Sequence, residues 1–262
     1  MPVQIMGVLN VTPDSFSDGG RFLDLESALR QARQLIAEGA AILDVGGEST
    51  RPGAEPVSTA EELRRVIPVL EALRSETTVR LSIDTMKPEV ADAALRAGAT
   101  LINDVTGLRD PEMIDTAARH HAGVVIMHMR GTPQTMRAMT EYADVVTEVK
   151  EFLARQAAAA RAAGIAEIIV DPGIGFSKTA AQSFTLLRRL GEFQDLGYPI
   201  LIGPSRKSFL SSIAGMEKPA DRLEGTLAAT AIGVLNGASI IRAHDVAACW
   251  RAAMTAAAVR SS

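Results

Sequence analysis

Eight short apolar runs recur along the 262-residue chain, and this repetition limits its possible folds more than any other feature. Each run is followed by a loop and then by a segment with helical periodicity. Most of the runs are continuously hydrophobic, as strands buried on both faces of a parallel sheet are. The predicted strands are Val3–Asn10, Ala41–Gly46, Arg80–Thr85, Thr100–Val105, Gly123–His128, Glu167–Pro172, Pro199–Pro204 and Ser239–Ala243.

The segments between the runs predict helices. Leu25–Glu38 has apolar residues on one stripe, and further helices are expected at Tyr142–Ala163 and Leu223–Leu235. Several of these segments end in a glycine just before the next strand, where a left-handed backbone can end a helix. Eight units of about 30 residues, without a linker between them, predict one α/β domain over residues 1–262. We expect a closed (β/α)₈ TIM barrel. The alternative is an open doubly wound sheet, but the number and even spacing of the units favour the barrel.

Composition excludes some classes of function. The formal net charge is −4 and no long basic run occurs, so a nucleic-acid-binding role is not expected. The single cysteine, Cys249, cannot form an intramolecular disulfide, which fits a reducing compartment. The first residues lack the features of a signal peptide, and no segment has the roughly 20 apolar residues of a membrane span. A cytoplasmic location is therefore expected.

Polar residues gather at the carboxyl ends of the predicted strands, where TIM barrels place their chemistry. In strand order, these residues are Asn10, Asp44, Asp84, Asn103, His128, Asp171, then Ser205, Arg206 and Lys207, and finally Arg242 and His244. A ring of buried polar groups lowers stability unless a ligand satisfies it. An inert scaffold is therefore not expected.

Single members of this ring have alternative interpretations. Asp84 could cap the helix that begins near Pro88, because Asp is a favoured N-cap residue. Asp44 has apolar neighbours and fits a structural role, and His128 fits either packing or ligand contact. Asp245 is interpreted as a helix cap. The segment Asp171–Phe176 contains Gly-x-Gly but lacks the rest of a dinucleotide-binding fingerprint.

The order of charges around the ring indicates the class of ligand. Acids and amides lie on strands three, four and six, whereas Lys207, Arg242 and His244 follow strands seven and eight, where barrels often bind phosphate. Asn10 offers an amide oxygen of the kind that Mg²⁺ accepts beside substrate phosphates. The expected ligand is a donor-rich ring that carries phosphate. Long loops after strands one and two are expected to act as lids.

Several motifs closely resemble those of the dihydropteroate synthase family, over nearly the whole chain. Met6–Gly20 is similar to the family's first signature, and Asp44–Gly53 is similar to its second. Shorter family motifs follow in the same order at Ser82–Thr85, Ile102–Val105, Met127–Met129, Asp171–Phe176 and Ser205–Ser208.

This resemblance implies a transferase of folate biosynthesis that joins a pterin diphosphate to p-aminobenzoate and is a target of sulfonamides. It implies pterin contacts from Asp84, Asn103, Met127, Asp171, Lys207 and Arg242. It implies diphosphate contacts from Asn10, Arg242 and His244, with Asn10 also holding Mg²⁺. It implies a p-aminobenzoate pocket bordered by Thr50, Arg51, Phe176 and Ser208, with Lys207 beside it. Phe16 and Asp18 of the first loop would close over the reacting carbon, and Asp84, Lys207, Asp18 and Phe16 would be the catalytic residues.

The family implies a dissociative mechanism, in which diphosphate leaves first and Asp84 and Asp18 stabilise the resulting cation. It also implies a homodimer, for which the helices Leu223–Leu235 and Val246–Val259 are candidates, although they could equally cover the barrel. Two alternative functions are a methyltetrahydrofolate methyltransferase-type barrel and a pterin-binding protein without catalysis. The Ser205–Lys207 segment and the Arg51 loop argue against the former, and the diphosphate residues argue against the latter.

Overall fold

The computed structural model describes residues 2–11, 21–51 and 53–262, except for the side chains of residues 21–24. The parallel strands are β1 (Gln4–Asn10), β2 (Ile42–Gly46), β3 (Arg80–Asp84), β4 (Leu101–Asp104), β5 (Gly123–Met127), β6 (Ile168–Asp171), β7 (Leu201–Ile202) and β8 (Ile240–Ala243). The helices are α1 (Arg21–Ala37), α2 (Thr59–Glu76), α3 (Pro88–Ala97), α4 (Pro111–Arg119), α5 (Val145–Ala162), α6 (Ala180–Arg188), α7 (Leu223–Leu235) and α8 (Val246–Ser261). Short 3₁₀ helices are η2 (Met136–Ala138), η3 (Leu190–Leu196), η4 (Ser208–Ser212) and η5 (Pro219–Arg222).

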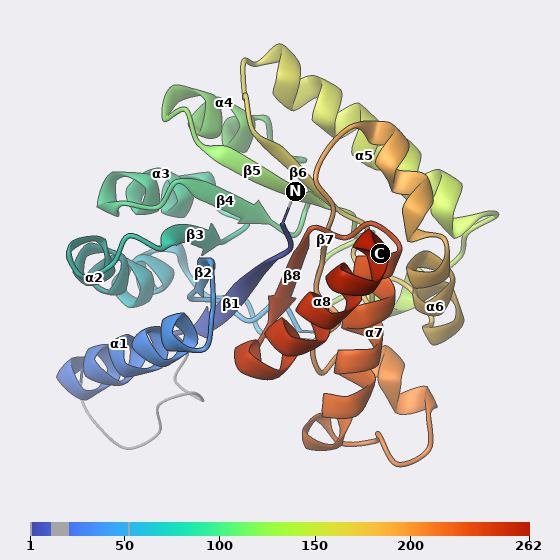
Figure 1. Ribbon diagram of the computed structural model, residues 1–262. Coiled ribbons are helices and arrows are strands. Elements are labelled where there is room, and N and C mark those ends of the chain that lie inside the picture. Colours follow the sequence, from blue (N-terminus) through green and yellow to red (C-terminus); the bar gives the residue numbers. More distant parts are fainter. Residues whose placement is uncertain (1, 12–20, 52) are drawn as a thin grey trace.

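The sheet is a barrel, as the repeated units predict. Its strand order is β6-β5-β4-β3-β2-β1-β8-β7, so the first strand pairs with the last. A bridge between Val170 and Ile200 joins β6 to the start of β7 and closes the ring. The helices lie outside the strands (Figure 1). This order excludes the doubly wound alternative, in which the strand order reverses within an open sheet.

Strand β7 is the main difference from the predicted elements. It spans Leu201–Ile202, whereas the sequence predicted Pro199–Pro204. The apolar pattern extends over the longer range, but each proline lacks the N–H that a ladder bond needs. Pro199 contributes only its carbonyl, which accepts from the Val170 N–H at 3.0 Å. The hydrogen bonds between β7 and its neighbours therefore end at Ile202, a few residues before Lys207.

Local capping explains where several helices begin and end. Ser58 caps α2, Asp144 caps α5, and Thr179 forms a capping box with Gln182 at the start of α6. Gly98 ends α3 with φ 119°, a left-handed conformation that an L side chain would resist. The predicted glycine ends of the helices are confirmed at this position. The caps fix the loop lengths at the carboxyl ends of the strands.

The interior of the barrel contains a layer of apolar side chains, which we call the lower layer. It comprises Met6, Ile42, Leu101, Val125, Ile169, Leu201 and Ile240, all buried. Successive strand residues face opposite sides of a sheet, so the residue two positions later faces the interior again. On five strands this next inward residue is a predicted site residue or its neighbour: Asp44, Asn103, Met127, Asp171 and Arg242. We call these residues, together with Asp84 of β3, the upper layer.

The rest of the core lies between the outer face of the barrel and the helices. Within the described residues, none of the helices combines the length and apolar character needed to cross a membrane.

Candidate active site

Arg242 reaches from β8 across the upper layer to two carboxylates. Its Nε donates to Asp44 Oδ2 at 2.6 Å, and its Nη2 donates to Asp84 Oδ2 at 2.6 Å. Both carboxylates are buried, with Asp44 0% and Asp84 5% exposed, and the guanidinium is their counterion. The prediction that the acids and the cations lie on opposite sides of the ring is therefore wrong for Arg242. Its side chain is long enough to cross the barrel, and buried acids require a nearby cation.

Asp44 belongs to this polar centre. Its Oδ2 also accepts from Asn103 Nδ2 at 2.9 Å, so a single oxygen holds both Arg242 and Asn103. The sequence interpretation favoured a structural role because the neighbours of Asp44 are apolar. Asp44 was included in the predicted ring, and its inward position in the strand alternation was the signal that could have favoured a part in the site.

Asp84 is part of the site and does not cap α3. Lys87 occupies the N-cap position of that helix, without a side-chain capping bond. Burial raises the pKa of Asp84 to about 7, and the opposing effect of Arg242 only partly offsets it. Asp84 Oδ1 has no hydrogen-bond partner among the described residues. This oxygen is an acceptor available to a bound ligand.

Asp171 occupies the next acidic position of the upper layer, at the end of β6. Its Oδ1 accepts from the backbone N–H of Gly173 at 2.7 Å. Burial raises the pKa of Asp171, and the charge of Lys207 is the largest opposing influence. At Gly173, φ is 67° and an added Cβ would lie 2.0 Å from the carbonyl oxygen of His128, so no other residue fits this turn.

Lys207 lies beside the same loop. Its Nζ donates to the carbonyl of Ile174 at 2.7 Å and lies 4.2 Å from the centre of the Phe176 ring. Burial lowers the pKa of Lys207 to about 8, although Asp171 and Asp84 favour its charged form. Phe176 also packs against the cluster that contains Met127. The structure therefore brings three predicted site residues, Lys207, Phe176 and Met127, to one edge of the mouth.

His244 follows β8 but is not a cation at neutral pH. Burial lowers the pKa of His244 to about 4, helped by the charges of Arg242, Arg51 and Arg206. Its Nδ1 lies 3.0 Å from Ser205 Oγ. The predicted positive corner therefore depends on arginines, and a neutral His244 contributes only hydrogen bonds.

The loop after β7 is fixed by an ion pair between Arg206 and Asp245. Arg206 donates to both carboxylate oxygens of Asp245, at 2.8 and 2.5 Å. Asp245 is the N-cap residue of α8, as predicted, but its side chain makes no capping bond. Its carboxylate instead fixes the residue between Ser205 and Lys207.

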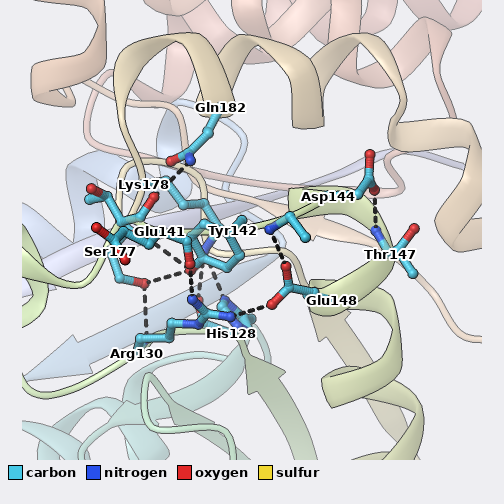
Figure 2. A network of polar contacts seen from close by, with 12 residues as sticks. His128, Arg130, Glu141, Tyr142, Asp144, Thr147, Glu148, Ser177, Lys178 and Gln182 are labelled. Carbon is cyan, nitrogen blue, oxygen red and sulfur yellow. Dashed lines mark hydrogen bonds and ion pairs between the residues drawn. The ribbon is translucent and has the colours of Figure 1, made fainter.

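His128 and Lys178 form a buried pair outside the upper layer. The Lys178 ammonium lies 2.9 Å from His128 Nδ1 and donates to the carbonyl oxygens of His128 and Phe176, at 3.2 and 2.9 Å. His128 also packs against Phe152 and Tyr142. Figure 2 shows this network joining the loops after β5 and β6. Of the two interpretations of His128, packing is the one that these contacts support. Lys178 was not among the residues predicted from the sequence.

A second buried cluster lies behind the loop after β2. The Lys87 ammonium pairs with Glu48 and with Glu62, whose side chains are 7% and 0% exposed. Gly47 lies against Glu62, and an added Cβ would meet its Cγ at 3.0 Å. This cluster joins the start of the loop to α2 and α3. Sequence reasoning missed it because its members are far apart in the chain.

The remaining predicted residues are less tightly placed. Asn10 ends β1 half-buried, Thr50 is half-buried, and Arg51 and Ser208 are exposed. Phe16 and Asp18 lie outside the described residues. Among the residues that are described, no group of three or more His, Cys, Asp or Glu side chains could hold a metal ion.

Comparison with known proteins identifies the family. The pterin binding enzyme family matches residues 6–244. Dihydropteroate synthase of Synechocystis is 50% identical over 247 residues, which cover 93% of this chain and 86% of the relative. The structure of Xanthomonas albilineans dihydropteroate synthase with 4-aminobenzoic acid has a TM-score of 0.93 and 46% identity, covering 100% of this chain and 94% of the other. The same enzyme in complex with 7,8-dihydropteroate gives a TM-score of 0.89 and 43% identity, covering 100% of this chain and 95% of the other. The chain belongs to the pterin-binding enzyme family, and within it to the dihydropteroate synthases.

Proposed function

We propose that the mouth of this barrel joins 6-hydroxymethyl-7,8-dihydropterin diphosphate to p-aminobenzoate, giving 7,8-dihydropteroate and diphosphate. The observation that carries the proposal is the set of inward-facing acceptors in the upper layer. Asp84 Oδ1 is buried without a donor, Asn103 presents its carbonyl away from Asp44, and Asp171 has a second oxygen beyond its bond to Gly173. The amino-pyrimidinone edge of a pterin supplies the N–H donors that such a set requires.

The pterin ring would lie among Asp84, Asn103 and Asp171, with Met127 packed beside it. Lys207 would contact both the ring and the second substrate, since its ammonium lies between the Ile174 carbonyl and the Phe176 ring. Arg242 would lie along the ring face and reach the phosphate side. The p-aminobenzoate pocket would be bordered by Phe176, with Thr50, Arg51 and Ser208 around it.

The diphosphate would bind where β1 and β8 adjoin. Gln4–Gly7 of β1 pairs with Ile240–Ala243 of β8, so Asn10, Arg242 and His244 belong to adjacent strands or follow them. A single amide oxygen from Asn10 fits Mg²⁺, because this ion usually takes one or two protein ligands and completes its shell with phosphate oxygens and waters. When bound, Mg²⁺ would neutralise part of the diphosphate charge.

The reaction would be dissociative. The bond between the pterin methylene carbon and the diphosphate oxygen breaks first, and its electron pair leaves with diphosphate. The resulting cation is conjugated with the pterin ring, and the carboxylates of Asp84 and Asp18 would stabilise it. The lone pair of the p-aminobenzoate amine then forms the C–N bond, and the amine proton passes to water. Phe16 and Asp18 would close the first loop over the reacting carbon, so that positioning supplies much of the rate.

Diphosphate release is the direct test. The protein is incubated with the pterin diphosphate, p-aminobenzoate and Mg²⁺, and each component is omitted in turn. Release that needs both substrates supports the synthase reaction. Pterin binding without release would favour a non-catalytic binding protein, and methyl transfer from methyltetrahydrofolate would favour a methyltransferase-type barrel. A sulfonamide titration of the same assay should give inhibition that p-aminobenzoate relieves.

The metal role is tested separately. Removing Mg²⁺ with a chelator should weaken diphosphate binding while leaving the affinity for 6-hydroxymethylpterin, which lacks the diphosphate, unchanged. Asn10→Ala should raise the Mg²⁺ concentration needed for half-maximal rate. Equal metal dependence in Asn10→Ala and the unsubstituted protein would remove Asn10 from the metal site.

We further propose that the chain acts as a homodimer through α7 and α8. Ile232, Leu235, Trp250 and Val259 are large apolar side chains of these helices that are 45%, 45%, 44% and 61% exposed. Large apolar side chains exposed on neighbouring helices commonly mark a protein interface. Light scattering after size exclusion should give twice the monomer mass, and Trp250→Glu should shift the mass toward the monomer.

We propose that residues 1–262 work as one barrel domain in the cytoplasm. Its substrates are small polar molecules, and its single cysteine is buried and free. A single cooperative unfolding transition would support one domain. Recovery of the activity in the soluble cytoplasmic fraction of the source cells would support the location.

A further inference from the structure

We propose that Asp44 is a positioning residue that sets the hydrogen-bond polarity of the pterin subsite, by holding Asn103 and Arg242 on one carboxylate oxygen. The inference rests on the proposed roles of Asn103 and Arg242 in binding the pterin. It adds that a residue of β2, which does not itself touch the pterin, determines how Asn103 and Arg242 bind it.

The contact with Asn103 fixes the orientation of its amide. A carboxylate only accepts hydrogen bonds, so the Asn103 group at 2.9 Å from Asp44 Oδ2 must be its NH₂. The carbonyl oxygen of Asn103 is then the part left for a ligand. Without Asp44, the amide could rotate and present either a donor or an acceptor at the same position. Asp44 therefore makes Asn103 an acceptor.

The contact with Arg242 fixes the plane of its guanidinium. Nε is held by Asp44 Oδ2 and Nη2 by Asp84 Oδ2, both at 2.6 Å. Two bonds from different nitrogens of one rigid group determine its orientation. The same arrangement occupies Asp84 Oδ2 and leaves Asp84 Oδ1 without a donor. The ligand thus meets acceptors on both β3 and β4.

Asp44 is placed to act through these neighbours and not by touching the substrate. Its side chain is 0% exposed, and it lies one inward position above Ile42 in the lower layer. Arg242 and Asn103 both contact its Oδ2. A role as a mere counterion for Arg242 is the alternative, and it predicts that only the charge at position 44 matters.

Two substitutions distinguish charge from hydrogen-bond acceptance. Asp44→Leu removes both, whereas Asp44→Asn removes the charge and keeps a carbonyl oxygen that can still accept from Asn103 and Arg242. The probe is 6-hydroxymethylpterin, and its dissociation constant is measured by calorimetry. We expect Asp44→Leu to raise this constant by about tenfold or more, and Asp44→Asn to stay within about threefold of the unsubstituted protein. Equal weakening by both variants would overturn the proposal in favour of the counterion role.

Val45→Ala is the matched control for lost stability. Val45 is the next residue of β2, is equally buried, and faces the helices instead of the barrel interior. It should lower the melting temperature without changing pterin affinity. If Val45→Ala weakens pterin binding as much as Asp44→Leu does, the effect of Asp44 is general destabilisation and the proposal fails.

Asn103→Asp tests the same contact should Asp44→Leu fail to fold. It replaces the NH₂ that Asp44 Oδ2 holds by an oxygen and sets two carboxylates against each other, so pterin affinity should fall by about tenfold or more. Unchanged affinity in Asn103→Asp would overturn the proposal.

Asn103→Ala separates this inference from the proposed function. If Asn103→Ala leaves pterin affinity unchanged, the assignment of Asn103 to the pterin subsite is wrong. If Asn103→Ala weakens binding while Asp44→Leu does not, the subsite is right and the positioning role of Asp44 is wrong. In the Asn103→Ala background, Asp44→Leu should lose most of its effect, because one of the two groups that Asp44 orients is gone.

Discussion

The ammonium of Lys207 lies 4.2 Å from the centre of the Phe176 ring and donates to the carbonyl of Ile174 at 2.7 Å. A cation at this distance from an aromatic face is attracted by about 0.5–2 kcal/mol, more when water is excluded. The ring therefore helps to keep Lys207 protonated although burial lowers its pKa to about 8.

Phe176→Leu should affect the p-aminobenzoate pocket selectively. The leucine keeps an apolar wall but gives no attraction to Lys207, so the ammonium is less well fixed. We expect the KM for p-aminobenzoate to rise about fivefold, with little change in the KM for the pterin diphosphate. Steady-state kinetics with each substrate varied in turn measures both constants. An equal rise in both would place Phe176 outside the p-aminobenzoate pocket.

Asp171→Asn should weaken pterin binding by about tenfold or more. Asp171 Oδ1 accepts from Gly173, so an asparagine would keep its carbonyl there and turn its NH₂ toward the ligand. Two donors would then face each other. Calorimetry with 6-hydroxymethylpterin measures the loss. Asp195→Asn is the control, since it removes one carboxylate that is 74% exposed and paired with Lys150; it should bind normally.

Asp84→Asn should remove part of the pH dependence of stability. The folded-state pKa of Asp84 is raised to about 7 from 3.8, so the folded protein holds this proton more tightly than the unfolded chain does. Between about pH 4 and 7 stability therefore falls as pH rises. The variant should be more stable than the unsubstituted protein at pH 8 and should lose this advantage near pH 4.

Chemical denaturation at several pH values from 4 to 8 measures this difference. The prediction fails if the two proteins differ by the same amount at every pH. Turnover should be strongly reduced in Asp84→Asn at all pH values, because the ionised carboxylate is lost from the proposed site.

Lys178→Met should loosen the loop after β6. The ammonium bonds two carbonyl oxygens, of His128 and Phe176, which would be left without this donor. Hydrogen exchange of the backbone amides of residues 176–178 should become about tenfold faster, and the KM for p-aminobenzoate should rise with it. Lys150→Met, which removes a surface lysine paired with Asp195, should leave both unchanged. Unaltered exchange in Lys178→Met would show that the loop is held by other contacts.

The barrel could be predicted from the sequence because its signal is repeated. Each strand is a short buried run, and each is followed by a helix with its own start and stop residues. The predicted boundaries of β7 differ from the observed ones because Pro199 and Pro204 interrupt its ladder. The apolar pattern continues through both prolines, but the backbone hydrogen bonds do not. Strand order could also be predicted, since consecutive parallel units normally lie side by side.

The candidate site could be predicted only as a set of residues at one end of the barrel. Which of them touch depends on how far side chains reach across the interior, as Arg242 does to Asp44 and Asp84. Whether a group is charged depends on burial, which lowers the pKa of His244 to about 4. Lys178 and Lys87 carry no local motif, and only the folded arrangement brings them to their partners.

The spacing of two residues between the lower and upper layers limits where insertions and deletions can occur in the chain. On β2, β4, β5, β6 and β8, the same alternation that buries an apolar residue also turns the next inward residue toward the mouth. Inserting or deleting one residue inside any of these strands would turn its upper-layer residue toward the helices and a residue of the helix-facing side toward the ligand. Changes of length should therefore accumulate in the connections, while the strands keep their lengths. Related barrels can therefore differ widely in sequence while the spacing of two residues between the lower and upper layers is kept.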